Sequence, residues 1–298
     1  MSTAAALIKR NIKLFFKDKG MFFSVLITPI ILLILYTTFL RNIYMESFTS
    51  VIPEQLSVPD SLLNGLVDTQ LVSSLLAVSC ITIAFCSNML MVQDKASGVI
   101  KDLRISPVKS STLSISYYAA TFLSSVMICL IALVLCLIYM AIEGWFLPLA
   151  DIGLMVLDVI LLVMFGCALS SVINFFLTTQ GQISAVGTIV SSGYGFICGA
   201  YMPIAFFGKG LQTVLMFFPG TYGTALIRNH AMRSAIAELV KQGLPSAAAE
   251  GIKDSIDCNI YFQDARVGIP TMYIVLGATI AVLLFIYIIM NMIKKGNK

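Results

Sequence analysis

The chain has 298 residues, of which 58% are apolar and 11% charged, and its formal net charge at pH 7 is +4. Soluble domains carry about 45–50% apolar and about 25% charged residues, so this composition excludes a water-soluble enzyme, a disordered chain and a free nucleic-acid-binding protein. The sequence therefore predicts an all-α integral membrane protein, in which the positions of the few charges carry the information.

Six apolar runs are each long enough to cross a bilayer as a helix, which needs about 20 residues. They cover residues 21–40, 70–92, 112–141, 153–177, 183–202 and 271–293, and we expect them to form one transmembrane domain over residues 1–298. A further apolar run, Leu211 to Phe218, is too short to span. We expect 203–225 to form a re-entrant or interfacial hairpin on the outer side, followed by a small outer cap that extends to residue 268. Within this cap, Ala231 to Val240 and Ser246 to Ile256 are expected to form short amphipathic helices.

Lys and Arg in the flanking segments set the orientation, because cytoplasmic segments are enriched in both. With both termini inside, segments 1–20, 93–111, 178–182 and 294–298 hold twelve Lys or Arg and three acidic residues. The first outer loop, 41–69, holds one Arg against four acidic residues. Both termini are therefore predicted to be cytoplasmic, and the basic start of the chain does not fit a cleavable signal peptide.

Residues 1–20 predict an amphipathic helix at the membrane interface. At helical spacing, Ile8, Ile12, Phe15 and Phe16 share one face. The adjoining face carries the basic residues Lys9, Arg10, Lys13 and Lys17. Two interpretations remain open, namely a positive flank of the first span, or a surface helix that also helps to dock a soluble partner.

The loop 93–111 mixes both signs of charge, so it does more than set topology. Its middle is predicted to make one or two helical turns that end at Pro107. A short charged helix between two spans suits mechanical transmission from a partner to the membrane, and an ordinary solvated connector is the alternative.

This loop resembles the membrane subunits of ATP-binding-cassette exporters, specifically the ABC-2-type permease family. The family's order of acid, base, Gly, apolar residues, Ser-Pro and an apolar residue is matched by Asp94, Lys95, Gly98, Ile100, Leu103, Ser106, Pro107 and Val108. Lys101-Asp102 reverses the usual acid-then-base order, and Arg104 stands at a usually apolar position. A second stretch is similar to the family's signature after the fifth span, with Gly199, Pro203, Pro219, Tyr222 and Arg228.

The sequence has no GxxxxGK[ST] phosphate loop, so this chain is not expected to be the nucleotide hydrolase. The resemblance implies a separate ATPase subunit in two copies, which would bind ATP and Mg, and a second permease copy or close homologue in a bacterial inner membrane with its lipids. It also implies an ATPase-coupling surface. We expect this surface to include Asp94, Lys95, Gly98, Lys101, Asp102, Arg104 and Pro107 of the loop and Lys9, Arg10, Lys13 and Lys17 of the first helix.

Polar and small residues in the second and fifth spans are the candidates for a translocation pathway, with helix–helix packing as the alternative role. They are Ser79, Asn88, Ser191, Ser192 and Tyr194. Asp158 is either a carboxylate at the outer interface or a pathway contact. His230 has no nearby set of Cys or carboxylate residues in the sequence, so no metal site is expected, and His230 is expected at the outer surface. Cys258 is expected outside the membrane, as a free thiol or as a disulfide partner across a dimer.

These expectations lead to a permease subunit of an ATP-driven exporter that works as a dimer. An amphipathic drug, lipid, peptide or lipid-linked glycan suits the apolar spans better than a highly charged solute. Two other classes are an integral membrane lipid-linked transferase and a stand-alone secondary carrier. The first needs clustered acids or an interfacial base, and the second needs buried charge, and the sequence is poor in both.

Overall fold

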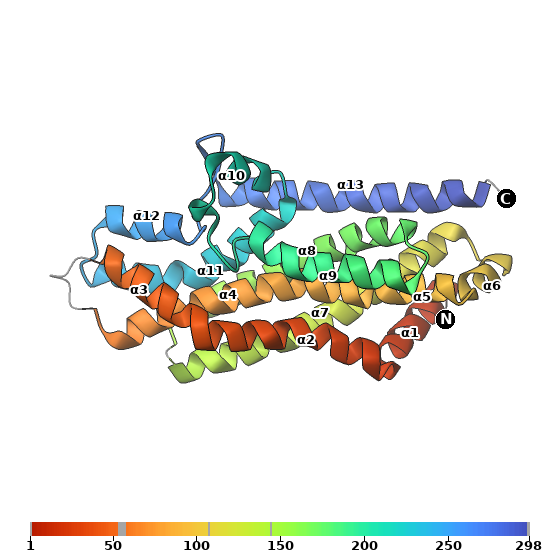
Figure 1. Ribbon diagram of the computed structural model, residues 1–298, viewed down its shortest axis with the longest axis horizontal. Helices are drawn as coiled ribbons and strands as arrows, with labels where there is room; N and C mark the ends of the chain where they lie inside the picture. Colours follow the sequence, from red (N-terminus) through yellow and green to blue (C-terminus); the bar gives the residue numbers. More distant parts are fainter. Residues whose placement is uncertain (1, 53–57, 107, 144, 297–298) are drawn as a thin grey trace.

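The computed structural model describes residues 2–52, 58–106, 108–143 and 145–296. Its long helices run along one axis of an elongated bundle, as Figure 1 shows. They are α2 (Lys19–Leu35), α4 (Asp60–Ser87), α7 (Ser110–Glu143), α8 (Leu149–Phe176), α9 (Gln180–Ile197), α11 (Pro219–Lys241) and α13 (Ile269–Gly296).

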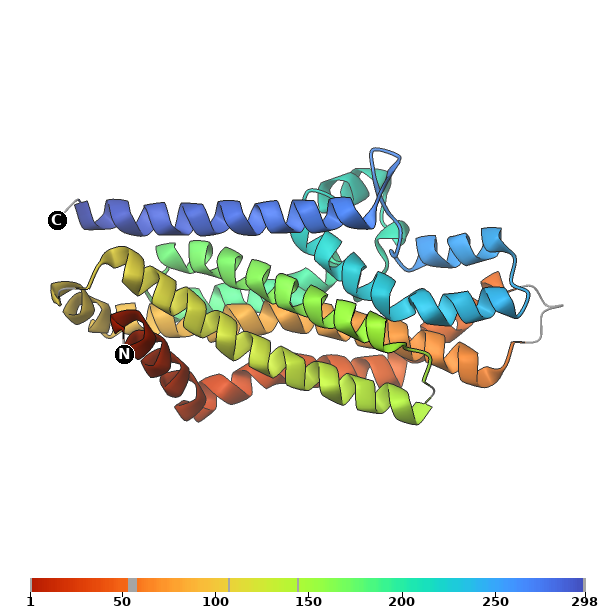
Figure 2. The same cartoon turned by 180° about the vertical axis from the view of Figure 1, so that it is seen from behind.

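Shorter elements gather at the two ends of the bundle. The start of the chain and the end of α13 lie at one end, together with α1 (Thr3–Lys17), α5 (Met89–Ala96) and α6 (Val99–Ile105) (Figures 1 and 2). We call this the α1 end. At the opposite end, the α12 end, lie α3 (Arg41–Val51) and α12 (Ser246–Ser255). The 3₁₀ turn η2 (Ile204–Phe206) and α10 (Lys209–Leu215) lie near the start of α13.

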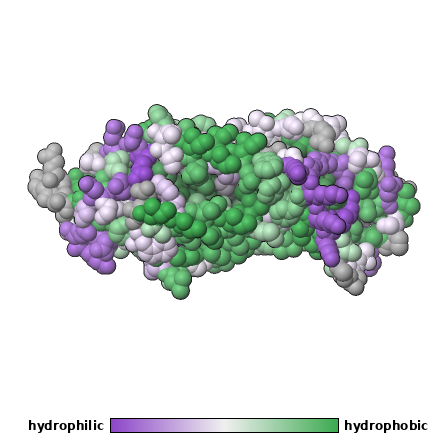
Figure 3. Space-filling view, turned by 90° about the horizontal axis from the view of Figure 1, so that it is seen from below, coloured by the Kyte–Doolittle hydropathy of each residue, from purple (hydrophilic) through white to green (hydrophobic). Residues whose placement is uncertain are grey.

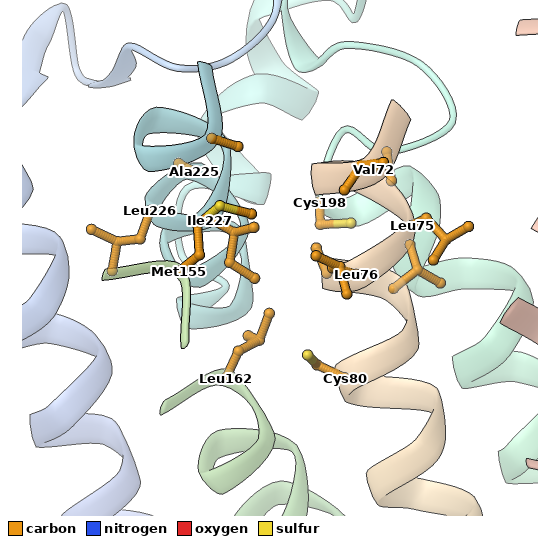
Figure 4. Packing of buried hydrophobic residues seen from close by; sticks show 14 of the residues in the cluster. Val72, Leu75, Leu76, Cys80, Met155, Leu162, Cys198, Ala225, Leu226 and Ile227 are labelled. Carbon is orange, nitrogen blue, oxygen red and sulfur yellow. The ribbon is translucent and has the colours of Figure 1, made fainter. Parts of the chain in front are cut away.

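Helix α4 is the centre of the bundle. It contacts α2, α3, α7, α8, α9 and α11, and from Gly65 to Phe85 its side chains are all buried. In Figure 4, Leu76 of α4 points toward Ile227 of α11 and Leu162 of α8 in the apolar core. Such close apolar packing supplies dispersion contacts, which hold helices together where lipid weakens the hydrophobic effect between them.

The surface of the bundle has the pattern of a membrane protein. Hydrophobic side chains cover the middle of the face in Figure 3, and hydrophilic side chains gather toward both ends. Large apolar side chains point outward in this middle zone, for example Ile30 at 53%, Ile131 at 56% and Phe285 at 65% exposure. Exposed apolar surface on this scale is expected only where lipid or another chain covers it.

Within the described ranges, five helical stretches are long and apolar enough to cross a membrane: Val25–Glu46, Asp60–Ala96, Ser110–Ile142, Leu149–Phe176 and Ile269–Ile293. The expected span 183–202 is not among them. It corresponds to α9, which has 18 residues and is rich in Gly, Ser, Thr and Gln, and this composition lowers its hydropathy. The structure therefore supports a multi-pass membrane protein with five of the expected spans.

The first span has an unusual course. Helix α2 contains Pro29, and a π-helical segment, η1 (Tyr36–Leu40), connects it directly to α3. Proline removes one backbone hydrogen bond from a helix, and a π-helical turn inserts an extra residue, so both features bend the path of the chain. Buried Tyr36 fixes the junction, because its hydroxyl donates to the carbonyl of Ala200 at 3.2 Å.

The region after α9 differs from the expected hairpin and cap. Helix α10 is short, but α11 then runs for 23 residues, so the short helix expected from Ala231 to Val240 is the second half of α11. Most of α11 is buried against α4, α8 and α13. The sequence of α11 does not show the apolar periodicity of a helix with one exposed face, because most of α11 is buried and its polar residues pair inside the fold. The second expected short helix is α12.

A two-stranded hairpin connects α12 to α13. Strands β1 (Ile260–Phe262) and β2 (Ala265–Val267) are antiparallel, with Tyr261 opposite Arg266. The turn residues Gln263 and Asp264 both have positive φ, which is typical of the two-residue turns that match strand twist. Cys258, just before β1, is a free thiol that is only 2% exposed. Burial raises its pKa to about 12, which makes the reactive thiolate scarce.

Candidate coupling site

Asp94 connects three helices at the α1 end. It lies in the last turn of α5 and is only 6% exposed. Arg10 of α1 donates through Nη1 to Asp94 Oδ2 at 2.8 Å, and the hydroxyl of Tyr117 on α7 donates to the same oxygen at 2.5 Å. The hydrogen bond to Asp94 raises the pKa of the Arg10 guanidinium. Charge-assisted bonds of this kind are about twice as strong as neutral ones, so Asp94 ties α1 and α7 to α5.

Lys95, the next residue, binds in another direction. Its Nζ donates to the carbonyl oxygens of Asn174, Phe175 and Leu177 at 2.6, 2.9 and 3.2 Å. These carbonyls end α8, where the last turn lacks helical partners and the helix dipole is negative. The ammonium also lies 5.6 Å from the centre of the Phe175 ring. The adjacent residues Asp94 and Lys95 therefore join α5 to α1, α7 and α8.

Gly98 turns the chain into α6. Its φ of +85° lies in the left-handed region, which favours glycine, and it caps the N-terminus of α6. Ile100 and Leu103 attach α6 to a small hydrophobic cluster that includes Leu7 of α1 and Tyr287 of α13. Helix α6 is therefore packed in one cluster with residues of the first and the last helix of the chain.

The outer face of α6 is free of such packing. Lys101 and Asp102 are exposed, and Ile105 is exposed at 84%. A single exposed apolar side chain between charged ones suits a contact surface. Of the other residues expected in this surface, Pro107 lies outside the described residues, as does the side chain of Arg104.

Helix α1 packs on α7 and presents a basic face away from it. Leu7, Asn11 and Phe15 are its buried residues, one turn apart, and they face the bundle. Ile8, Ile12 and Phe16 lie beside this stripe and are half-buried, whereas Lys9, Lys13 and Lys17 are exposed. A cavity of about 530 Å³ opens between the end of α1 and α5, lined by Leu14, Lys17, Asp18, Leu90, Gln93, Asp94, Ala96 and Ser97.

The sequence matches the family of ABC-2 type transporters over residues 3–230. The chain belongs to this family. A comparison with curated proteins gave no match. The ABC-2 type transporter domain is the transmembrane subunit of an ABC transporter and not its ATPase, and the family implies an ABC ATPase as partner. The matched range includes the whole network around Asp94 and Lys95, and it ends before α12, the β-hairpin and α13.

Two of the expected pathway residues of this ABC-2 permease lie inside the helix bundle. Ser79 and Asn88 are 0% and 1% exposed. The Asn88 amide nitrogen donates to Ser170 Oγ at 2.9 Å and to Ser171 Oγ at 3.0 Å, on α8. Asn88 also stands at the interruption between α4 and α5. In the single chain its side chain joins helices, which is the packing alternative stated for these residues.

Helix α9 carries the remaining three. Tyr194 is buried, and its hydroxyl donates to the carbonyl of Gly220 at 3.0 Å. Ser191 is half-buried, and Ser192 is exposed. Ser192 belongs to an outward face of α9 with Ser184, Thr188 and Phe196, at four-residue intervals. The accessible part of the expected pathway is therefore on α9 and not on α4.

Asp158 is part of a buried polar cluster near the α12 end. It is 0% exposed; its Oδ2 lies 2.6 Å from His230 Nδ1, and its Oδ1 accepts from the Tyr273 hydroxyl at 2.5 Å. The expectation that His230 lies on the surface is wrong, since it is 3% exposed. One feature of the sequence could have indicated the pair, namely an intramembrane acid that requires a partner on another helix.

Gly199 and Arg228 of the second motif come together. Arg228 is 1% exposed, and its Nη2 donates to the carbonyl of Gly199 at 3.1 Å and to Ser74 Oγ at 3.2 Å. Asp257 pairs with Arg228 at 3.6 Å and accepts from the backbone N–H of Ile204 at 2.7 Å. Burial raises the pKa of Asp257 to about 6. Asp257, which the sequence did not single out, thus fixes the turn after α9.

The other three residues of this motif shape the same segment. Pro203 precedes η2, and Pro219 begins α11, a position where its missing N–H costs nothing. The Tyr222 hydroxyl donates to the carbonyl of Met216 at 2.7 Å, across the turn between α10 and α11. Together these residues hold α10 against the start of α11.

Proposed function

We propose that this ABC-2 permease is the membrane subunit of an exporter, that it works as a dimer with two ATPase subunits, and that its termini face the cytoplasm of a bacterial cell. The α1 end would then be cytoplasmic, and α9 would be the fifth of six spans. The basic face of α1 and the charge bias of the sequence support this orientation.

The arrangement of Asp94, Lys95 and α6 carries the proposal. An ATPase subunit that contacts the exposed face of α6 would load Ile100 and Leu103, and through them α1 and α13. The same movement would reach α1 and α7 through Asp94 and α8 through Lys95. Closure of the ATPase subunits on ATP would in this way tilt one protomer relative to the other. The chain's own residues hold no nucleotide in this mechanism.

The outward face of α9 supports the proposed dimer. Small and hydroxyl-bearing residues allow close approach of helices in a membrane, and on α9 they point away from the chain's own core. Two α9 helices that meet across a twofold axis would place Ser184, Thr188 and Ser192 along the passage. An amphipathic cargo suits such a lining, because the exposed apolar residues Ala185 and Ile189 lie beside these hydroxyl groups on the same helix. This cargo class includes drugs, lipids, peptides and lipid-linked glycans.

The direct test is co-purification with an ABC ATPase subunit from the same organism. Lys101→Glu and Ile105→Asp change only exposed residues of α6, so both variants are expected to fold and to lose at least about tenfold of the bound ATPase. Lys241→Glu, at the exposed end of α11, is the matched control and is expected to retain it. Wild-type ATPase binding by both α6 variants would overturn the assignment of this surface.

The dimer has a separate test. Thr188→Cys and Ser192→Cys on α9 are expected to form disulfide-linked pairs of permease chains under mild oxidation, whereas Ile274→Cys, exposed at 69% on α13, is expected to remain monomeric. Cross-linking at Ile274 instead of α9 would place the dimer contact on another face.

A further inference from the structure

A second cavity lies near the α12 end, far from the coupling site. It has a volume of about 540 Å³ and is bounded by α11, α12, strand β2 and the first residue of α13. Pockets for small ligands usually measure about 300–1,000 Å³. Of the surrounding helices, only the first part of α11 lies within the range that matches the ABC-2 family.

One wall of this cavity is apolar. Met232, Ile236 and Val240 line it from α11, and they follow one another at four-residue intervals, so they form a continuous stripe on one helix face. Val240 is 40% exposed at the open end of the stripe. Met232 and Ile236 are 0% and 3% exposed, so they form the floor of the cavity. The accessible apolar surface above this floor comes from Val240, from exposed Ala237 and from Ile269, which is 37% exposed, and an alkyl chain would bury it at a gain of about 25 cal/mol for each Å².

The opposite rim is basic. Lys253 of α12 and Arg266 of β2 share one carboxylate, with Lys253 Nζ at 2.8 Å from Glu250 Oε1 and Arg266 Nη1 at 3.1 Å from Glu250 Oε2. The hydrogen bond from Lys253 lowers the pKa of Glu250, so this acid stays ionised. A Lys has three donors and an Arg five, so each retains donors beyond those given to Glu250. Arg233, which pairs with buried Asp151, adds a third cation to the lining.

His230 of α11, which is 3% exposed, also lines the cavity. Asp158 holds its Nδ1, and Tyr273 holds Asp158, so the ring is fixed and only Nε2 and the carbon edges remain for the cavity. Because a buried side chain is positioned by two further residues, its orientation toward a ligand is prearranged.

We propose that this cavity binds an amphiphile with a single anionic head, a phosphate or a carboxylate. The apolar body lies against Ala237, Val240 and Ile269, and the head lies among Arg233, Lys253 and Arg266. The same chemistry is offered by a membrane lipid such as phosphatidic acid and by a free single-chain anion. The site is independent of ATPase docking, so either proposal can fail without the other.

The test is binding of dodecyl phosphate to the full-length chain in phosphatidylcholine nanodiscs, measured by native mass spectrometry and calorimetry. The wild type is expected to bind it at least about tenfold more tightly than dodecyl maltoside, which has the same chain and a neutral head. Inorganic phosphate alone is expected to bind weakly, because it lacks the apolar body. Equal affinities for the two dodecyl compounds would overturn the proposal.

Two variants change the affinity in opposite directions. The double substitution Lys253→Gln and Arg266→Gln removes head contacts from half-exposed positions and is expected to weaken dodecyl phosphate binding by at least about tenfold. Glu250→Gln removes the competing carboxylate and is expected to strengthen it several-fold. Lys241→Gln, a cation on α11 beyond this lining, is the control and is expected to bind as the wild type does. Weaker binding by Glu250→Gln would show a structural role instead.

The source of the ligand is settled by a second arm. Dodecyl phosphate binding is compared between nanodiscs of pure phosphatidylcholine and nanodiscs that also contain phosphatidic acid. The second kind holds about 10 mol% of this anionic lipid, on the order of the anionic lipid content of membranes. If the natural ligand is a lipid, phosphatidic acid competes with dodecyl phosphate and co-purifies with the wild type but not with the double variant. If the ligand is a free amphiphile, dodecyl phosphate binds equally in both nanodiscs.

Discussion

Asp158 and His230 lie 72 positions apart in the sequence, yet Oδ2 of the carboxylate and Nδ1 of the imidazole are 2.6 Å apart inside the bundle. The pair joins α8 to α11, and Tyr273 extends it to α13. Three helices are thus connected by polar contacts at one level of the α12 end. In a low-dielectric interior such contacts are strong when complete and costly when one partner is lost.

Replacing Asp158 should therefore destabilise the fold. Asp158→Asn removes the negative charge and replaces one of the two acceptor oxygens with an NH2 donor, so the contacts to His230 and Tyr273 are no longer both made as in the wild type, and we expect a loss of about 1.5–3 kcal/mol in the free energy of unfolding. Tyr273→Phe removes one hydrogen bond and should cost about 1 kcal/mol. All seven cysteines are buried or half-buried, so a maleimide dye reacts with them mainly when the chain unfolds. Labelling followed on heating therefore measures the midpoint of thermal unfolding. Ser192→Ala, on the exposed face of α9, is the control; a wild-type midpoint for Asp158→Asn would contradict the structural role.

The Asp94 network makes a prediction about α1. Asp94→Asn removes the charge that holds Arg10 and Tyr117, and we expect it to cost about 1.5–3 kcal/mol and to increase hydrogen exchange along α1. Arg10→Ala should produce the same exchange pattern, and the two changes together should add little, because they break one interaction. Asp102→Asn, on the exposed face of α6, should leave exchange in α1 unchanged. Additive effects of the first two substitutions would show that Arg10 and Asp94 act separately.

The two glycines with left-handed backbone at functional turns should differ in their response to alanine. At Gly98 a Cβ meets open space, so Gly98→Ala should cost only the backbone strain, about 1 kcal/mol. At Gly199 the Cβ would also collide with the Asp257 carboxylate, so Gly199→Ala should cost clearly more. Thermal midpoints of the two variants give the comparison. Equal losses would mean that Asp257 can move away freely.

Asp257 gives a pH dependence with a defined sign. Its pKa is raised from 3.8 to about 6 in the folded chain, so the folded state binds the proton more tightly than the unfolded state. This contribution to stability is complete below about pH 4 and is lost as the pH rises through about 6, with a full size of about 3 kcal/mol. The measurement is the thermal midpoint from pH 4.5 to 7.5, for the wild type and for Asp257→Asn. The variant should lack this component, although the unpaired Arg228 lowers its stability throughout. Parallel curves would contradict the raised pKa.

Sequence patterns identified the functional residues that lie close together in the chain. They missed the contacts that form between residues far apart in the chain. Asp94, Lys95 and Gly98 lie within one short segment, so spacing and resemblance were enough to single them out. Whether Ser79 or Ser192 is exposed depends on which helices surround each face, and α4 proved to be enclosed. Helix α11 was missed because its polar residues, among them Arg228 and His230, pair with groups that come from other parts of the chain.

The interruption at Asn88 has a mechanical consequence. Four hydrogen bonds join this residue to Thr121, Ser170, Ser171 and Asn174, so bending the chain between α4 and α5 would break contacts to two other helices at once. Each lost bond inside an apolar bundle carries a penalty, whereas rotation of the whole chain as a rigid body breaks none of them. We therefore expect the chain to move as one rigid body during transport. Under the proposed dimer, a passage would then open between two chains and not through one.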